Sequence, residues 1–251
     1  MKIIGISGRK QAGKNTTANI LHGLVLESKG LVRDFNVDNS GQLSVLTSDR
    51  AGTEDWGIFD VQRNDASFVE YAEHNMWPYV KMYSFADELK RICVELFEIP
   101  PECVYGTDDQ KNCIQDHILW ENMPKYQIDM STKPPSTKTG PMTAREFMQF
   151  FGTDICRNIF QPIWVNSCIN KIKREQSELA IIPDVRFPNE AKAIEDAGGT
   201  VIRLTRTVFD DQHSSELALD DYPFTDYIDN KDNSIDSLMV KVKKFYQNLK
   251  E

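Results

Sequence analysis

A glycine-bounded loop directly after the first apolar run constrains this chain more than any other feature. Residues 3–6 are mostly isoleucine and end at Ser7, and from Lys14 onward the apolar residues recur with helical spacing. The segment between them reads Gly-Arg-Lys-Gln-Ala-Gly-Lys-Asn-Thr-Thr, residues 8–17. A strand, a glycine loop and a helix in this order present backbone N–H groups at a helix N-terminus, where phosphate groups bind. The sequence therefore predicts a phosphate-binding loop.

Within this loop, Lys14 is the candidate catalytic cation, because its position matches the lysine that reaches the β- and γ-phosphates. The strict pattern has Ser or Thr directly after the lysine, and here Asn15 stands in that place. Either Thr16 reaches the magnesium shell, which we favour, or the Asn15 side-chain oxygen replaces the hydroxyl. A plain glycine turn with an exposed lysine is the alternative, and the strand and helix on either side disfavour it. The residues expected to hold a nucleotide here are Gly8, Ala12, Gly13, Lys14, Asn15, Thr16 and Thr17.

The rest of the chain alternates apolar strand patterns with helical ones. Further strands are predicted at residues 79–83, 180–182, 201–204 and 227–228, and an amphipathic helix closes the chain. This alternation predicts an α/β fold of P-loop NTPase type, a parallel sheet with helices on both faces. We expect a single domain over residues 1–251. Two stretches that break the alternation, at about 30–78 and 100–141, are expected to be inserted substrate or lid regions, and the proline-rich residues 134–141 a mobile loop.

Composition narrows the class of partner. With 40% hydrophobic and 27% charged residues the chain can bury a sizeable core, and a net charge of −9 opposes binding of long nucleic acids. The five cysteines include no CxxC pair, so no zinc or redox motif is expected, and a reducing cytoplasm suits the pattern best. No run of eighteen apolar residues and no signal peptide is present, so we expect no membrane association.

Asp184 follows the apolar residues 180–182, at the kind of strand end where P-loop proteins place the carboxylate that holds Mg²⁺ or its water. We therefore predict a catalytic and metal-binding role for Asp184, with Arg186 and Glu190 as further functional groups. The alternative is that Asp184 caps the next helix. Asp87, after the second strand, has the same two interpretations, evenly balanced.

The motifs together resemble the bacteriophage deoxynucleoside monophosphate kinases, a group of P-loop enzymes. The resemblance is carried by residues 8–17, 83–90, 145–154, 164–165, 183–186 and 213–216, with Asp229 and Asn230 further on. It runs from end to end and leaves the two insertions uncovered. It implies ATP-dependent phosphorylation of deoxynucleoside monophosphates to diphosphates, with Mg²⁺. The family usually has Asp at the position of Asn15, so that departure is mild.

The resemblance also implies an acceptor site. Its residues would be Lys10, Leu89, Lys90, Arg145, Gln149, Gly152, Thr153, Trp164 and Val165, to which the strand-end residues Arg186 and Glu190 are added. Arginine and lysine neutralise a monophosphate, glutamine reads a base edge, and tryptophan stacks on a base. Arg145 and Gln149 are four residues apart and would share one helix face.

Three further roles rest on position alone. By analogy, Arg206 would stack on adenine and Asn230 would read its edge. Arg157 or Lys111 would neutralise charge from a closing segment, and we choose Arg157.

Two other functions share such a loop. A GTP-dependent switch needs a DxxG motif after a strand and an NKxD motif, but residues 196–199 end a helix and residues 230–233 lack the final Asp. A kinase acting on DNA ends or on modified bases in DNA is the nearer alternative, and the acidic charge opposes it. A homodimer is the candidate assembly, and the expected location is the cytoplasm, that of a host cell if the chain is phage-encoded.

Overall fold

The computed structural model describes residues 1–48, 51–61, 63, 65–107, 109–124, 138–207 and 218–249. The chain divides into two compact units. Unit 1 consists of Met1–Phe85 and Cys168–Glu251, and unit 2 of Ala86–Ser167. Each unit is described by itself. The predicted single domain with two insertions stays a prediction.

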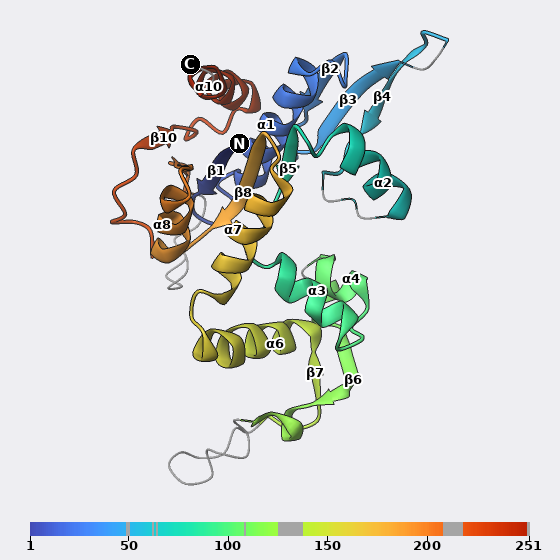
Figure 1. The fold of residues 1–251 in the computed structure, drawn as a ribbon, viewed down its shortest axis with the longest axis vertical. Helices are drawn as coiled ribbons and strands as arrows, with labels where there is room; N and C mark the ends of the chain where they lie inside the picture. The colour runs from blue at the N-terminus through green and yellow to red at the C-terminus, as the bar shows by residue number, and fades with distance from the viewer. Residues whose placement is uncertain are drawn as a thin grey trace. The chain divides into compact units, whose positions relative to one another are not determined.

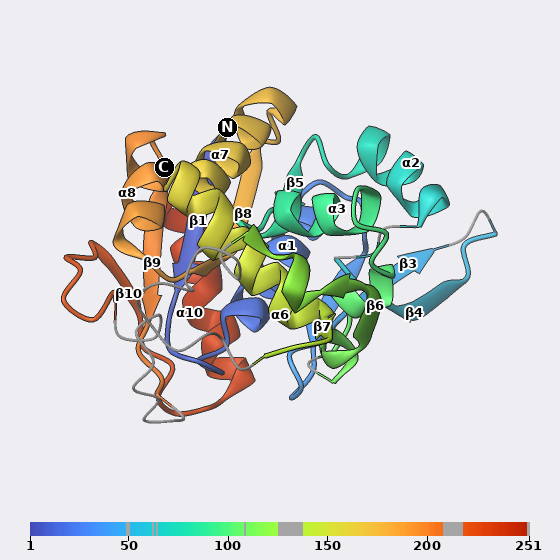
Figure 2. The same cartoon turned by 90° about the horizontal axis from the view of Figure 1, so that it is seen from below.

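A five-stranded parallel sheet forms the centre of unit 1 (Figure 1). Its strands are β1 (Lys2–Ser7), β5 (Val80–Met82), β8 (Leu179–Val185), β9 (Thr200–Leu204) and β10 (Asp226–Ile228). The order across the sheet is β10-β9-β1-β8-β5, every neighbouring pair is parallel, and Figure 2 shows β1, β9 and β10 side by side. The predicted α/β fold is confirmed, and this sheet is consistent with a P-loop NTPase.

Helices cover both faces of this sheet, as predicted. They are α1 (Lys14–Ser28), α8 (Pro188–Asp196) and α10 (Ile235–Asn248), while α7 (Ile163–Glu175) runs from unit 2 into unit 1. Ile4 and Ile6 share a buried cluster with residues of α1 and α10, whereas a Cβ at Gly5 would lie 2.6 Å from Cδ1 of Ile194 in α8. Because successive strand residues face opposite sides of a sheet, α1 and α10 lie on one face and α8 on the other.

The first predicted insertion folds as part of unit 1. It forms an antiparallel sheet of β2 (Asp34–Val37), β3 (Leu43–Ser48) and β4 (Glu54–Ile58), followed by α2 (Ala66–Asn75). Val37 and Leu43 are buried in the same cluster as α1. A Cβ at Gly23 of α1 would lie 2.3 Å from the Phe35 ring, so this glycine allows the close approach of β2. The segment is polar because only one side of this sheet is buried.

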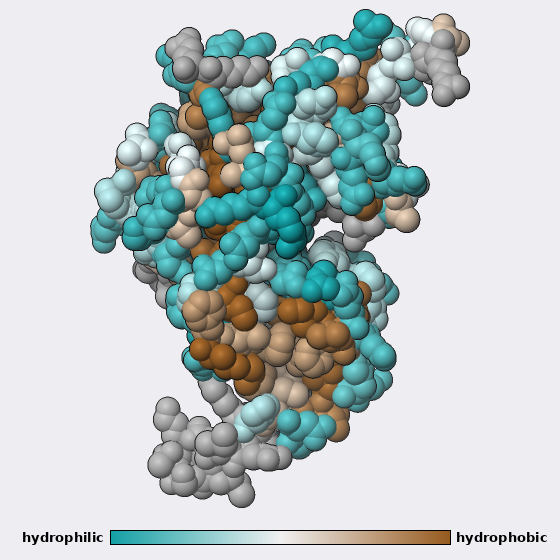
Figure 3. All heavy atoms as spheres, viewed as in Figure 1, coloured by the Kyte–Doolittle hydropathy of each residue, from teal (hydrophilic) through white to brown (hydrophobic). Residues whose placement is uncertain are grey.

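Unit 2 is mainly helical and has its own aromatic core. Its elements are α3 (Asp87–Glu95), α4 (Pro101–Tyr105), η1 (Gln110–Asn112), β6 (Ile114–Leu119), η2 (Trp120–Asn122), β7 (Pro141–Thr143), α6 (Ala144–Gln149) and the π-helix η4 (Phe150–Arg157). The rings of Phe97, Phe147 and Phe151 pack on one another, with centroids 4.6 to 5.7 Å apart. Figure 3 shows a largely apolar visible face on this unit and a mostly hydrophilic one on unit 1.

Cys103 and Cys113 form a disulfide within unit 2, and Cys93, Cys156 and Cys168 are buried thiols. The sequence analysis did not predict this pairing. Cys103 lies on α4 and Cys113 follows η1, so their pairing depends on a turn that the cysteine spacing does not reveal. Burial raises the pKa of the Cys93 thiol to about 12, so this thiol is not a nucleophile at neutral pH.

Two sequence predictions concern residues for which the structure gives no complete description. Residues 134–137 of the proline-rich run and all of residues 213–216 lie outside the described residues. Within the described parts of the chain, no helix combines the length and apolar character needed to cross a membrane.

Candidate functional site

Residues 8–13 connect β1 to α1 and form the predicted loop. Gly13 is the N-cap of α1 with a φ of 93°, in the left-handed region that strains residues other than glycine. A Cβ at Gly8 would lie 3.1 Å from Cβ of Ala12 and 3.2 Å from Cβ of Leu204. The loop therefore folds tightly over the strand ends. No side chain of the described residues caps the first turn of α1, whose N–H groups are suited to an anion.

The Lys14 ammonium group rests against this loop. Its Nζ donates to the carbonyl oxygens of Gly8, at 2.7 Å, and of Arg9, at 3.0 Å. Both acceptors are backbone groups of the loop itself. These two neutral acceptors lie beside the loop N–H groups, and a phosphate oxygen could replace them at a gain in charge-assisted bonding.

The three residues after Lys14 differ in accessibility. Asn15 is exposed, Thr16 is half-buried, and Thr17 is buried with an Oγ1 that has no hydrogen-bond partner among the described residues. A Cβ at Gly41, in the turn between β2 and β3, would lie 2.4 Å from Oγ1 of Thr16. The turn of the inserted sheet thus faces the Thr16 hydroxyl, and both interpretations of the magnesium ligand stay open.

Asp184 lies near the carboxyl end of β8, beside the loop. Ser84, two residues after the end of β5, donates its Oγ hydrogen to Oδ2 of Asp184 at 2.6 Å. Helix α8 begins at Pro188 with Phe187 as its N-cap, so Asp184 is not the cap of that helix. The carboxylate is oriented by a hydroxyl from the neighbouring strand, which the sequence analysis did not anticipate. Asp87 is the first residue of α3, whose N-cap is Ala86, so it is not a cap either.

Glu190 has a different role from the one expected. It is 3% exposed, and its Oε2 accepts from the backbone N–H groups of Arg186, at 2.8 Å, and Phe187, at 3.1 Å. The carboxylate therefore closes the first turn of α8, and we do not include it in the acceptor site. The side chains of Lys10 and Arg186 are exposed in unit 1.

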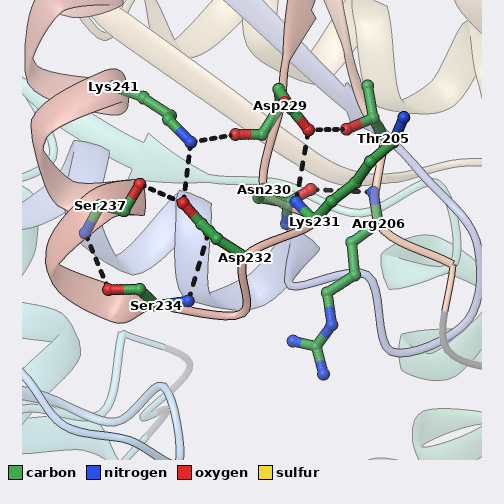
Figure 4. Close-up of polar contacts among 9 residues, drawn as sticks. All are labelled: Thr205, Arg206, Asp229, Asn230, Lys231, Asp232, Ser234, Ser237 and Lys241. Carbon is green, nitrogen blue, oxygen red and sulfur yellow. Dashed lines mark hydrogen bonds and ion pairs between the residues drawn. The ribbon is translucent and has the colours of Figure 1, made fainter.

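Arg206 and Asn230 meet at the ends of β9 and β10 (Figure 4). The backbone N–H of Arg206 donates to Oδ1 of Asn230 at 2.9 Å, and Nδ2 of Asn230 donates to the carbonyl of Ala12 at 2.7 Å. Asn230 is 4% exposed, so its amide serves backbone groups and leaves no edge for a base. The expectation that Asn230 reads adenine conflicts with this geometry. The Arg206 guanidinium extends away from the cluster and has no ion-pair partner among the described residues.

An acid between two arginines lies beside the loop and was missed by the sequence analysis. Asp220 pairs with Arg9 of the loop and, at 2.8 Å, with Arg203 of β9, which also donates to Oγ of Ser7 at 2.9 Å. Side-chain exposures of 17% and 13% for Arg9 and Arg203 show that both cations are largely covered. No pattern in the sequence connects Asp220 to residues near position 8.

In unit 2, the predicted helix carrying Arg145 and Gln149 is present as α6. Arg145 is half-buried and Gln149 exposed, while Phe147 is buried on the other side. Nε of Arg145 donates to Oδ1 of Asn112, at 3.1 Å, which orients the guanidinium. Lys90 of α3 lies over the ring of Tyr105, with Nζ 5.2 Å from the centroid. Asn112 is a further candidate, and it directly precedes Cys113 of the disulfide.

The π-helix η4 holds three more predicted residues, Gly152, Thr153 and Arg157. A Cβ at Gly152 would lie 2.6 Å from Cδ2 of Leu89, so these two residues pack closely. Such π-helical turns are rare and often occur at functional sites. Thr153 is exposed and Arg157 half-buried.

Trp164 and Val165 are core residues. Each is 4% exposed, and Nε1 of Trp164 donates to the carbonyl of Gly152 at 2.9 Å. A stacking contact between Trp164 and a base conflicts with this burial. Both residues contribute to unit 2 through packing, which is the usual role of a buried tryptophan.

The loop and its surroundings fit a magnesium–nucleotide complex. At Gly8 the close approach of Ala12 and Leu204, and at Gly13 a φ of 93°, favour glycine and allow the tight loop that a phosphate-binding site needs. Within the described residues, no group of three or more His, Cys, Asp or Glu side chains could hold a metal ion by itself. Mg²⁺ keeps several waters and takes one or two carboxylates together with phosphate oxygens, and Asp184 supplies one such carboxylate near the loop.

The parallel sheet, the glycine loop with its lysine after β1 and the carboxylate near the end of β8 define the P-loop class of α/β nucleotide-binding proteins. A family model described as deoxynucleotide monophosphate kinase matches residues 93–242, more than half of the chain. The chain belongs to the deoxynucleotide monophosphate kinase family, as the resemblance predicted, and its function is phosphorylation of deoxynucleoside monophosphates.

A curated relative supports the same family. The chain is 31% identical over 150 residues to a protein of Acanthamoeba polyphaga mimivirus that is provisionally named a deoxynucleotide monophosphate kinase. The alignment covers 54% of this chain and 67% of that protein. The phosphate-binding loop precedes the residues that the family model matches, so its assignment rests on its geometry.

Proposed function

We propose that this chain transfers the γ-phosphoryl group of ATP to the phosphate of a free deoxynucleoside monophosphate. The observation that carries the proposal is the arrangement in unit 1 of the loop, Lys14 and Asp184 at the carboxyl ends of the neighbouring parallel strands β1 and β8. Ser7, the last residue before the loop, is in register with Val185, and Asp184 directly precedes Val185, so Asp184 and the loop lie at the same end of the sheet. This strand-end placement is where open α/β sheets bind their ligands.

The donor nucleotide would bind to unit 1. Loop N–H groups would donate to its phosphate oxygens, and Lys14 would exchange the carbonyls of Gly8 and Arg9 for β- and γ-phosphate oxygens. This exchange replaces neutral acceptors by charged ones, which strengthens the bond to the ammonium group. Arg206, whose guanidinium has no acidic partner among the described residues, would lie against the base.

The metal would be held from two sides. Asp184, oriented by Ser84, would bind Mg²⁺ or one of its waters, and Thr16 or Asn15 would supply an oxygen from α1. When bound, Mg²⁺ neutralises charge on the transferring phosphates and orients them.

Trp164, Val165 and Glu190 are buried and are therefore excluded from the acceptor site. The other candidates for this site lie mainly in unit 2. Arg145 would bind the monophosphate, with Lys90 as a second cation and Gln149 as a base contact. Arg157 would neutralise charge on the transferred group. An oxygen of the acceptor phosphate attacks the γ-phosphorus, the bond to the bridging oxygen breaks, and ADP leaves, so no covalent enzyme intermediate is needed.

A substrate panel tests this proposal. ADP release would be measured with the four common deoxynucleoside monophosphates, modified pyrimidine deoxynucleotides, ribonucleoside monophosphates and duplex DNA. We expect turnover with at least one free deoxynucleoside monophosphate and little label transfer from ATP to DNA, because the net charge of −9 repels a polyanion. Label that appears chiefly in DNA would refute the monophosphate as acceptor and leave the nucleotide-binding loop unaffected.

Arg145→Ala separates the acceptor role from the donor role. Loss of a charge-assisted contact should lower kcat/KM for the acceptor by about one to two orders of magnitude and leave the Kd for ATP unchanged. Arg91→Ala is the matched control, because Arg91 is an exposed arginine of the same unit that pairs with Glu88 and Glu95. Equal effects of the two substitutions would remove Arg145 from the acceptor site.

A further inference from the structure

The connection between β10 and α10 reaches across two strand ends to the phosphate-binding loop. Asn230 follows β10, Arg206 follows β9, and Ala12 belongs to the loop after β1, in the sheet order β10-β9-β1. The amide of Asn230 contacts the other two, as a donor to the Ala12 carbonyl at 2.7 Å and as an acceptor from the Arg206 N–H at 2.9 Å. These partners require opposite ends of the amide, so they determine its orientation.

The bond to Ala12 controls the direction of a neighbouring donor. A trans peptide is planar, so its C=O and N–H point in opposite directions. Fixing the Ala12 oxygen toward Asn230 therefore turns the N–H of Gly13 away from Asn230. Gly13 is close by, since a Cβ there would lie 3.6 Å from Nδ2 of Asn230. The direction of one loop N–H group thus depends on a side chain from the far end of the sequence.

Asn230 is itself held in place by its neighbours (Figure 4). Oδ1 of Asp229 accepts from Oγ1 of Thr205 at 2.8 Å, and Nζ of Lys241 in α10 donates to the Asp229 carbonyl at 2.6 Å. Lys241 also pairs with Asp232 at 3.2 Å. The connection is therefore held to the residue after β9 and to α10. These contacts restrain the backbone that carries the Asn230 side chain.

We propose that Asn230 is a positioning residue that fixes the phosphate-binding loop and the Arg206 backbone relative to each other. This rests on the proposed donor site and adds the residue that sets its geometry. Asn230 acts through backbone groups and contacts neither base nor phosphate. Its loss should therefore weaken binding of phosphates that carry no base.

Inorganic tripolyphosphate with Mg²⁺ is the decisive probe, because it presents phosphate groups without adenine. Binding of tripolyphosphate and of ATP would be measured by calorimetry for the full chain, Asn230→Ala and Arg206→Ala. We expect Asn230→Ala to raise the Kd for both ligands about ten-fold or more, since it leaves the Ala12 carbonyl buried without its donor. Arg206→Ala should raise the Kd for ATP alone, and neither substitution should change KM for the acceptor.

Ser237→Ala is the matched control. Ser237 lies in the first turn of α10 and donates to Asp232 of the same connection at 2.6 Å. It takes no part in the bonds to Ala12 and Arg206. This variant should bind tripolyphosphate as the unchanged chain does. A rise equal to that of Asn230→Ala would mean that any loosening of the connection weakens binding, and the specific role of Asn230 would be refuted.

A second variant covers the case in which Asn230→Ala does not fold. Asn230→Asp keeps the side-chain volume and the acceptor for Arg206 but removes the donor to Ala12. Hydrogen exchange of peptides that cover residues 8–17, measured without ligand, should be faster in this variant. The exchange reports the loop itself and is independent of how the new charge acts on phosphates.

The outcomes separate the two proposals. Unchanged tripolyphosphate binding in Asn230→Ala, or unchanged exchange of residues 8–17 in Asn230→Asp, would overturn the positioning role. A loss confined to ATP would assign Asn230 to the base and would also overturn it. A chain that binds tripolyphosphate but phosphorylates no deoxynucleoside monophosphate would refute the proposed function alone, whereas a chain that binds no tripolyphosphate would refute both.

Discussion

At the scale of residues, the proposed donor site is organised before any nucleotide binds. Lys14 bonds to two loop carbonyls, Asp184 accepts from Ser84, and Asn230 holds Ala12. Each contact fixes a charged or polar group that would otherwise have to be ordered during binding. Such preorganisation lowers the entropic cost of binding and of reaction.

We predict that Lys14→Ala lowers kcat by about 10²-fold or more, because it removes the cation proposed to act on the transferring phosphates. The fold should be retained, since the ammonium group bonds to carbonyls of a surface loop. Steady-state ADP release and circular dichroism check both statements. Lys192→Ala, which alters an exposed lysine of α8 paired with Asp196, should leave both unchanged. Activity of Lys14→Ala within a few-fold of the unchanged chain would exclude the loop from the mechanism.

The contact between Asp184 and Ser84 predicts that changing either residue alters the dependence of activity on Mg²⁺. Asp184→Asn should lower kcat and raise the Mg²⁺ concentration for half-maximal activity. Ser84→Ala should act in the same direction by about ten-fold, because it removes the hydroxyl that donates to the Asp184 carboxylate at 2.6 Å. A magnesium titration of ADP release decides. Curves that superimpose on that of the unchanged chain would assign Asp184 a structural role.

At the scale of elements, the disulfide links α4 to the residue before β6 and thereby holds Asn112 near α6. Cys103 and Cys113 are 10 positions apart, and Arg145 donates to Asn112, which directly precedes Cys113. The neighbouring backbone is tied in as well, because the Ala144 N–H donates to the Cys113 carbonyl at 3.0 Å. This part of unit 2 therefore combines a covalent link with a proposed substrate contact.

We predict that reducing this disulfide lowers the free energy of unfolding by about 2–3 kcal/mol, the entropy of closing a loop of this length. It should also raise KM for the acceptor, because Asn112 would orient Arg145 less well. Thermal unfolding and acceptor kinetics with and without dithiothreitol measure both effects. Cys103→Ser should reproduce them and be insensitive to the reductant, while Cys168→Ser serves as the control for a buried thiol outside the pair. If dithiothreitol leaves KM for the acceptor of the unchanged chain the same, the disulfide does not influence the acceptor site.

At the scale of the whole molecule, acid should destabilise the chain through a buried histidine. His22 in α1 is 1% exposed, and neither ring nitrogen has a hydrogen-bond partner among the described residues. Burial lowers its pKa from 6.5 to about 3. Between these values the unfolded chain binds a proton that the folded chain does not. The stabilisation is therefore complete above pH 6.5 and is lost as pH falls toward 3.

The free energy of unfolding is predicted to fall by about 1.4 kcal/mol for each pH unit below pH 6.5. Urea unfolding at pH 7, 6 and 5 measures it, in a range above the ordinary pKa of the carboxylates. His22→Leu should flatten the curve, because it removes the titrating group and keeps the position apolar. A slope that persists in His22→Leu would locate the acid sensitivity elsewhere.

The sequence by itself determined the local elements and the nature of the phosphate loop. Residues 3–6, 180–182 and 201–204 lie in strands because short, mainly aliphatic runs suit a sheet that is covered on both faces. Gly13 marked the turn because only glycine adopts its backbone conformation without strain. These signals are local, so they can be read from neighbouring residues.

Only the tertiary structure decided which distant groups meet. The contact of Asn230 with Ala12 spans 218 positions and that of Arg9 with Asp220 spans 211. Both depend on the order β10-β9-β1, which no short pattern encodes. Burial likewise separated Glu190 and Trp164 from the exposed candidates, although their residue types suit a substrate site. The physical reason is that a side chain's function depends on its solvent access and its partners, and both are set by the packing of segments far apart in the chain.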